Sequence, residues 1–166
     1  MNKLSTEIKE KINILKTKYP ETEACIIPSL HLIHDVTGYI TAKHCSILGE
    51  FLEISPIKIL ETASFYSMFN KKEIGKYHIQ VCRNISCSLK GSKKLMEILE
   101  NNFSIIPEKT TDDNLFTLTP VECLGSCGTS PVIMINNEYH ESMTEEKLIK
   151  LIEKLKSDEG GVNKNE

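Results

Sequence analysis

Hydrophobic residues in the N-terminal part of the chain recur at helical spacing. The first group lies three or four residues apart, at Leu4, Ile8, Ile12 and Leu15. This spacing places apolar side chains on one face of a helix, and Pro20 predicts where that helix ends.

Cap and turn residues predict three further helices in this part of the chain. A helix over Ala24–Thr37 is followed by Gly38, which suits the left-handed conformation of a C-cap. Thr41 can N-cap the next helix, which runs to Leu52. Ser55, followed by a proline, begins the last one, because its hydroxyl can satisfy free backbone N–H groups while proline fixes φ at the first helical position.

The pattern changes near Gly75, because apolar and polar residues alternate from Tyr77 to Val81. This is the spacing of a strand, and the strand leads into Cys82. The other elements that the pattern predicts are a helix at about Leu89–Asn101, strands at Leu115–Leu118, Val132–Ile135 and Tyr139, and a last helix from Thr144 to about Leu155. The predicted order of the main elements in this half is therefore β-α-β-β-α, and the short fourth strand at Tyr139 follows the third strand across a turn.

These elements predict an α+β fold in three parts. Residues 1–73 are expected to form a helical N-terminal domain, and residues 74–156 a β-α-β-β-α domain. Residues 157–166 are expected to be a disordered tail, because they are polar and have no core to build.

Composition narrows the class of protein. A chain of 166 residues with 40% hydrophobic content can pack a core without disulfides. The formal net charge of -3, with lysines and glutamates interleaved, provides no basic face for nucleic acid.

No apolar run reaches the roughly 20 residues that cross a bilayer, and the N-terminus shows no signal or transit pattern. We therefore expect a cytoplasmic protein without membrane insertion, whose cysteines are reduced thiols or metal ligands.

Four of the six cysteines form two close pairs. Cys82 and Cys87 have the spacing C-x4-C, and Cys123 and Cys127 have the spacing C-x3-C. Each pair closes a strand-like run and opens a loop rich in glycine and serine, which is how thiolates are gathered around a metal centre. These four cysteines are the candidate ligands.

The spacing favours some uses of these cysteines over others. Structural zinc is usually held by C-x2-C pairs, and a thioredoxin-like dithiol needs C-x-x-C at a helix N-terminus. The wider spacing here favours a larger group, such as a two-iron cluster with two thiolates on each iron. Cys25 and Cys45 lie in predicted helices and are interpreted as buried apolar side chains. A cysteine nucleophile with His78 or His140 as its base stays open, although nothing in the sequence places either histidine beside a cysteine.

Longer motifs resemble a known family. They are the runs LHLIHDVTGYITAKH, ASFYSMF, GKYHIQVCRNISC and VECLGSCGTSPVIMIN. Over about Tyr19–Leu155 the chain is similar to the thioredoxin-like 2Fe-2S subunits, known as E subunits, of bacterial NADH:quinone oxidoreductases, or complex I. The resemblance is specific, because ASFYSMF and both cysteine motifs keep the family's order and spacing. Residues 110–114 and 128–131 depart from the family's frequent T-P-D-G and D-x-A-P, and neither departure changes a ligand.

The resemblance implies a helical domain joined to a thioredoxin-like 2Fe-2S ferredoxin domain with a small mixed sheet. It implies that Cys82, Cys87, Cys123 and Cys127 hold one 2Fe-2S cluster. It further implies a subunit of a peripheral arm, on the cytoplasmic side of the inner membrane, that docks on the flavin- and NADH-binding subunit and accepts single electrons from FMN. Hydride chemistry then belongs to the partner, and no catalytic acid, base or nucleophile is expected here.

Two alternative functions stay open. The family also serves NAD-linked hydrogenases and formate dehydrogenases, and nothing in this single chain separates these from complex I. From a different class, the four thiolates could hold structural zinc in a binding module. A helical N-terminal half favours a subunit with a partner to hold over an isolated ferredoxin.

Three aromatic residues in the ASFYSMF motif can pack in a core or contribute to a docking surface. Aromatic side chains serve both roles, because each buries a large apolar area and is also common at interfaces. We expect Phe65 to lie in the core, and Tyr66 and Phe69 stay open between the two roles.

Overall fold

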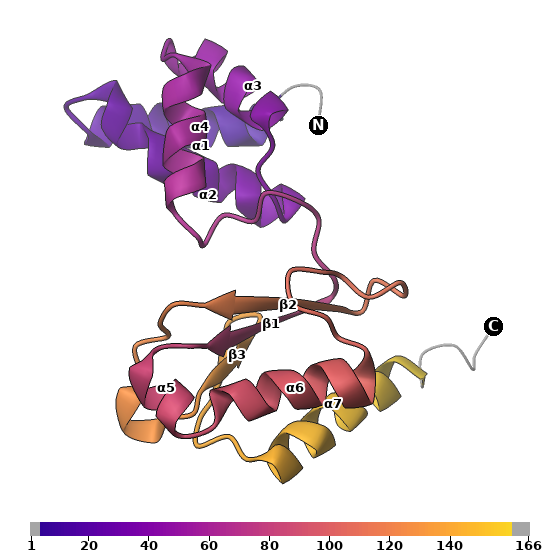
Figure 1. Ribbon diagram of the computed structural model, residues 1–166. Coiled ribbons are helices and arrows are strands. Elements are labelled where there is room, and N and C mark those ends of the chain that lie inside the picture. The colour runs from indigo at the N-terminus through magenta and orange to yellow at the C-terminus, as the bar shows by residue number, and fades with distance from the viewer. Residues whose placement is uncertain (1–3, 161–166) are drawn as a thin grey trace. The chain divides into compact units, whose positions relative to one another are not determined.

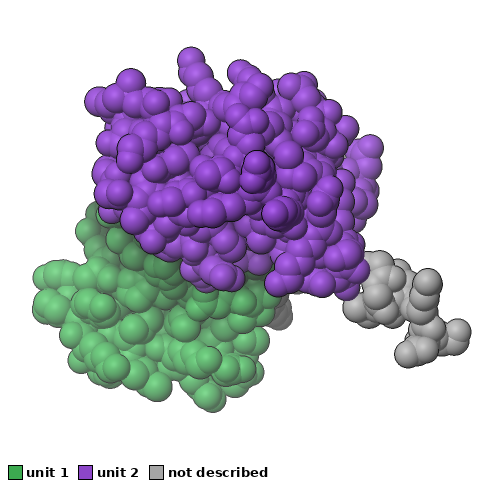
Figure 2. Space-filling model, turned by 90° about the horizontal axis from the view of Figure 1, so that it is seen from below, with its two compact units in different colours: residues 1–73 green, residues 74–166 purple. Residues whose placement is uncertain are grey.

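The computed structural model describes residues 4–160 and divides into two compact units. Unit 1 comprises residues 1–73 and unit 2 comprises residues 74–166 (Figures 1 and 2). Each unit has its own hydrophobic core. The two units are described separately below.

Unit 1 is a helical bundle, as the apolar spacing predicts. Its elements are α1 (Thr6–Lys18), the 3-10 turn η1 (Thr22–Cys25), α2 (Ile26–Thr37), α3 (Ala42–Leu52) and α4 (Pro56–Phe65). The bundle packs around side chains from all four helices, including Ile12, Leu30, Leu48 and Ile59. Cys25 and Cys45 are 0% and 1% exposed, which confirms them as core side chains. Burial raises the pKa of the Cys45 thiol and keeps that thiol protonated.

The predicted caps of unit 1 are present with one exception. Gly38 ends α2 with φ of 76°, and Thr41 begins α3 in a capping box, in which its hydroxyl accepts from the His44 N–H at 3.3 Å. Ser55 stands at the N-cap of α4 with Pro56 in the first turn, but its hydroxyl makes no capping hydrogen bond. The predicted role of the Ser55 hydroxyl is therefore wrong, and proline alone marks this helix start.

The prediction that Phe65 lies in the core is wrong. Phe65 is 82% exposed, whereas Phe69 is 1% exposed and packs against the rings of His31 and His34. The reason is the rotation of the helix. The buried residues of α4 include Ala63, and two further residues turn the chain by roughly 200°, which points Phe65 away from the core.

Unit 2 contains the predicted strands and helices, in the order β-α-β-β-β-α once the short strand at residues 138–140 is counted, with two additional short helical segments. Its elements are β1 (Tyr77–Cys82), α5 (Ile85–Leu89), α6 (Ser92–Phe103), β2 (Phe116–Val121), the 3-10 turn η2 (Cys127–Thr129), β3 (Ile133–Ile135), β4 (Glu138–His140) and α7 (Glu145–Gly160). The helix predicted at Leu89–Asn101 begins later than expected. Gly91, with φ of 101°, separates α6 from the short helix α5, so Cys87 lies in a helix and not in an open loop.

The last helix is longer than its sequence pattern predicts. α7 continues to Gly160, so the first four residues of the predicted tail at 157–166 are helical, and the rest of that tail lies outside the described residues. The apolar pattern ends earlier because Lys156, Ser157 and Asp158 of α7 are exposed polar residues. Across residues 4–160, the structure contains no helix with the length and apolar character needed to span a membrane.

The sheet of unit 2 is small and mixed, in the order β2-β1-β3-β4. β1 runs parallel to β2 and antiparallel to β3, and Ile79 is paired with Leu118 on one side and Ile135 on the other. Figure 1 shows α6 and α7 side by side against one face of this sheet. Leu99 of α6 and Leu148 of α7 are fully buried in the core that they form with the strands. This confirms the predicted α+β fold.

Candidate metal centre

The first cysteine pair is fixed by the end of β1 and by α5. Cys82 is the last residue of β1, and its N–H donates to the Val132 carbonyl at 3.3 Å. Cys87 is the buried residue of α5, a helix that begins where the Asn84 side chain accepts from the Ile85 N–H at 2.7 Å. Both cysteines are 3% exposed and pack with Val132 in a small apolar cluster. β1 and α5 therefore fix this pair in a buried position.

The second pair is brought to the first by the parallel arrangement of β1 and β2. Carboxyl ends of parallel strands meet at one edge of a sheet. Cys82 is paired with Val121, so Cys123 follows β2 at the same edge. Cys127 opens η2 a few residues later, and both cysteines of this pair are exposed. The Gly125 N–H donates to the Cys123 sulfur at 3.3 Å.

The surroundings of Cys82 favour its thiolate. Burial alone would raise the pKa of the Cys82 thiol, and this is the largest single influence on it. Hydrogen bonds from the backbone at Asn84 and Leu124, and from the Cys87 and Cys123 thiols, act in the opposite sense and leave the pKa lowered. Backbone N–H donors directed at sulfur are also what an iron–sulfur centre requires.

The surroundings of Cys87 favour its protonated thiol, because its pKa is raised. Burial raises the pKa of its thiol, and the hydrogen bond with Cys82 and the negative charges on Cys82 and Cys127 raise it further. Repulsion of this kind is relieved when thiolates bind a cation. The four predicted residues are thus near one another: the thiols of Cys87 and Cys123 act on the pKa of Cys82, and Cys127 acts on the pKa of Cys87 through its charge.

The donor set at this edge consists of thiols. All six cysteines are free, so the four paired ones are available as thiolate ligands. Within residues 4–160, no three Cys, His, Asp or Glu side chains converge on a position for one metal ion. A two-iron cluster makes a different demand, with two thiolates at each of two irons. The arrangement of two pairs along one edge fits that demand.

One of the two histidines considered as a base, His78, makes contacts within the sheet. His78 lies on β1, and its Nε2 is 2.8 Å from the Thr119 hydroxyl of β2. Its backbone N–H donates to the Asn136 side chain at 2.9 Å. These contacts assign His78 to the pairing of the sheet.

Residues of β4 and of the segment that follows it also border the centre, and sequence reasoning missed them. The Tyr139 hydroxyl donates to the Leu124 carbonyl at 3.0 Å. The Glu141 carboxylate accepts hydrogen bonds from the Ser126 and Thr129 hydroxyls, which lower its pKa. No local motif signals these contacts, because the hairpin returns to the cysteine loop only in the folded chain.

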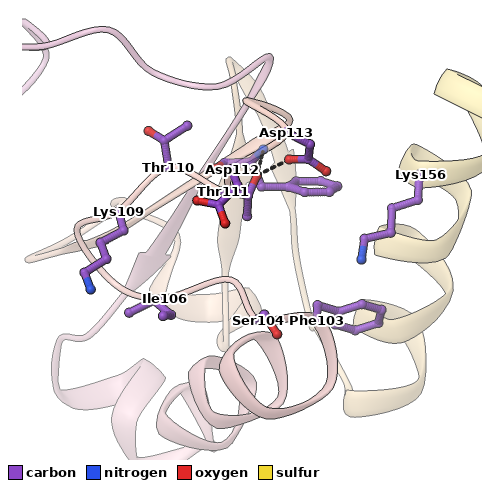
Figure 3. A pocket seen from close by; sticks show the side chains of 10 residues that line it. Phe103, Ser104, Ile106, Lys109, Thr110, Thr111, Asp112, Asp113 and Lys156 are labelled. Carbon is purple, nitrogen blue, oxygen red and sulfur yellow. Dashed lines mark hydrogen bonds between the residues drawn. The ribbon is translucent and has the colours of Figure 1, made fainter.

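A cavity lies at the opposite end of the strands. It has a volume of about 500 Å³ and is lined by the end of α6, the segment 109–113 and Lys156 of α7 (Figure 3). The Lys156 ammonium stands 5.1 Å from the centre of the Phe103 ring. Phe116, at the start of β2, lines the cavity, whereas Cys123 follows the end of that strand. The cavity is therefore separate from the cysteine centre.

A small mixed sheet backed by helices, with cysteines at and just beyond the carboxyl ends of its two parallel strands, fits a ferredoxin-type iron–sulfur protein. The family model described as thioredoxin-like [2Fe-2S] ferredoxin matches residues 12–156. The chain belongs to this family, as its motifs predict, and the family implies a 2Fe-2S cluster.

Similar proteins carry related names. The chain is 42% identical over 144 residues to the NADH-quinone oxidoreductase E subunit of Rickettsia felis, covering 85% of this chain and 86% of the relative. It is 32% identical over 152 residues to the NADH-quinone oxidoreductase E subunit, number 2, of Rhizobium meliloti, covering 92% and 90%. A crystal structure of an NAD+-reducing [NiFe]-hydrogenase in the H2-reduced state has a similar fold, with a TM-score of 0.67 and 24% identity. That match covers 77% of this chain and 22% of the hydrogenase chain.

Proposed function

We propose that this chain is the 2Fe-2S electron-transfer subunit of an NADH:quinone oxidoreductase. The observation that carries the proposal is the meeting of Cys82, Cys87, Cys123 and Cys127 at one edge of the sheet. The relatives named as E subunits, which match most of the chain at 32% and 42% identity, supply the kind of complex. The reaction class is single-electron transfer.

We propose these four cysteines as the cluster ligands. A 2Fe-2S cluster supplies a site that accepts and releases one electron. The protein's part is to keep four thiolates in place and to direct N–H groups at them, as the Gly125 N–H does toward the Cys123 sulfur. The first pair is buried and excludes water, whereas the second is exposed and gives a partner close approach.

The partner in this proposal is a flavin- and NADH-binding subunit. Single electrons come from its FMN, and NADH oxidation takes place on that subunit, within a peripheral arm on the cytoplasmic side of the membrane. This division of work suits the site, because its groups are thiols and backbone N–H donors suited to holding an electron carrier. The fold likeness to the NAD+-reducing hydrogenase favours a second candidate, the equivalent subunit of an NAD-linked hydrogenase.

Reduction by NADH should therefore depend on the partner. With its cluster assembled, the isolated chain is expected to stay oxidised in the presence of NADH. It should become reduced when the FMN-carrying subunit is added, as measured by the visible absorbance and the EPR signal of the cluster. The same subunit without FMN is the control. Reduction without the partner, or none with it, would contradict the proposal, and the subunits that co-purify from cells distinguish quinone reductase from hydrogenase.

A further inference from the structure

The loop that carries Cys127 is tied to a neighbouring segment by one carboxylate. An oxygen of Glu141 accepts from the Ser126 hydroxyl and, at 2.7 Å, from the Thr129 hydroxyl. The two hydroxyls are also 2.7 Å from each other. Ser126 directly precedes Cys127 and Thr129 follows it within the same 3-10 turn, so both sides of the cysteine are held from one point.

Backbone hydrogen bonds also join the segment after β4 to the cysteine loop. The Ser142 N–H donates to the Thr129 carbonyl at 2.6 Å, and the Met143 N–H donates to the Pro131 carbonyl at 2.9 Å. The segment 141–143 lies between β4 and α7, and Met143 is 6% exposed. Glu141 is therefore anchored to the sheet and to the core of unit 2.

Two other hydrogen bonds reach the cysteine loop, from the Ser130 hydroxyl to the Cys127 carbonyl at 2.9 Å and from the Tyr139 hydroxyl to the Leu124 carbonyl at 3.0 Å, but its glycines make the backbone permissive. Gly125 has φ of 75°, and a Cβ on Gly128 would meet nothing within 4 Å. Glycines on both sides of Cys127 leave the backbone with many accessible conformations. Cys127 is exposed, so core packing does not fix its side chain. An ionised carboxylate, which only accepts hydrogen bonds, is well suited to restrain two hydroxyl groups at once.

We propose that Glu141 is a positioning residue that holds Cys127, through the Ser126 and Thr129 hydroxyls, in the place where it binds the cluster. The attachment is a property of the folded chain alone, whereas its purpose rests on the proposed function. Removing the carboxylate loosens the loop, which speeds backbone opening and weakens the binding of Cys127 to the cluster.

Two measurements on Glu141→Ala test this. Hydrogen exchange of the metal-free chain should show amides of the segments 126–131 and 141–143 exchanging about three- to tenfold faster than in wild type. With the cluster assembled, release of iron to a chelator should be faster by a similar factor, and the EPR g-values should shift. Glu138→Ala is the matched control, because Glu138 is an exposed glutamate on the same hairpin and should behave as wild type.

A double variant separates positioning from a general effect on the fold. In the Thr129→Val, Ser126→Ala background, Glu141→Ala should add little, since its two hydrogen-bond donors are already gone. Unchanged exchange in Glu141→Ala would overturn the proposal, and so would faster exchange with unchanged iron release and EPR. A wild-type chain that takes up no cluster would overturn the proposed function together with the role of Glu141, whereas failure confined to the Glu141 variant overturns that role alone.

Discussion

Replacing Cys127 by alanine is expected to remove the EPR signal of the native cluster while the helices of unit 1 stay folded. Loss of a hydrogen-bond partner of a metal ligand already costs about 10- to 100-fold in metal affinity, and loss of a ligand costs at least as much. The fold should survive, because Cys127 is exposed and the core of unit 1 lies in a separate compact unit. Iron per chain measures cluster content, the EPR spectrum shows whether the cluster is native, and far-UV circular dichroism shows whether the helices stay folded.

Cys45→Ala is the matched control for this variant. It also removes one thiol, but from the core of unit 1, where the side chain is 1% exposed. We expect it to retain the native cluster and to lose a modest amount of stability, about 1 kcal/mol. An unaltered EPR spectrum in Cys127→Ala would remove Cys127 from the ligands.

The two phenylalanine side chains of the ASFYSMF motif are expected to differ sharply when each is truncated to alanine. Phe69→Ala should lower the free energy of unfolding of unit 1 by about 3–5 kcal/mol, because it leaves a cavity in a packed core. Phe65→Ala should stay within about 0.5 kcal/mol, because that ring is 82% exposed. Urea denaturation followed by circular dichroism measures both variants.

The Phe65 variant is itself the control, since it removes the same number of atoms from the same motif. Equal losses of stability in the two variants would contradict the burial of Phe69. A large loss in Phe65→Ala alone would support the core placement that the sequence pattern indicates for that residue.

Local signals account for most of the helical unit. Gly38 and Thr41 act within a few residues of their own positions, so a C-cap and a capping box can be predicted directly. Ser55 shows the limit of this reasoning, because it stands at the predicted N-cap without making the predicted hydrogen bond. The predicted burial of Phe65 is wrong for another reason. Whether an aromatic residue near a helix end faces the core depends on its rotation about the helix, and a motif read as a group of aromatics does not contain that information.

The structure of unit 2 depends more on contacts between residues that are distant in the sequence. The apolar residues of α5 and α6 read as one continuous helical pattern. The pattern therefore does not show that Gly91 separates two helices, or that Cys87 lies in the first of them. The cysteines can be predicted as one centre from their spacing and from the strands before them. Glu141 cannot, because only the return of the β3-β4 hairpin brings it to Ser126 and Thr129. Its partners belong to a loop whose composition is typical of ordinary turns.

The most direct test of the central claim is metal and sulfide analysis of the purified chain combined with EPR after dithionite reduction. The proposed site predicts about two irons and two acid-labile sulfides for each chain, with a rhombic S = 1/2 signal. Stoichiometric zinc without iron would contradict it and would favour a structural zinc module.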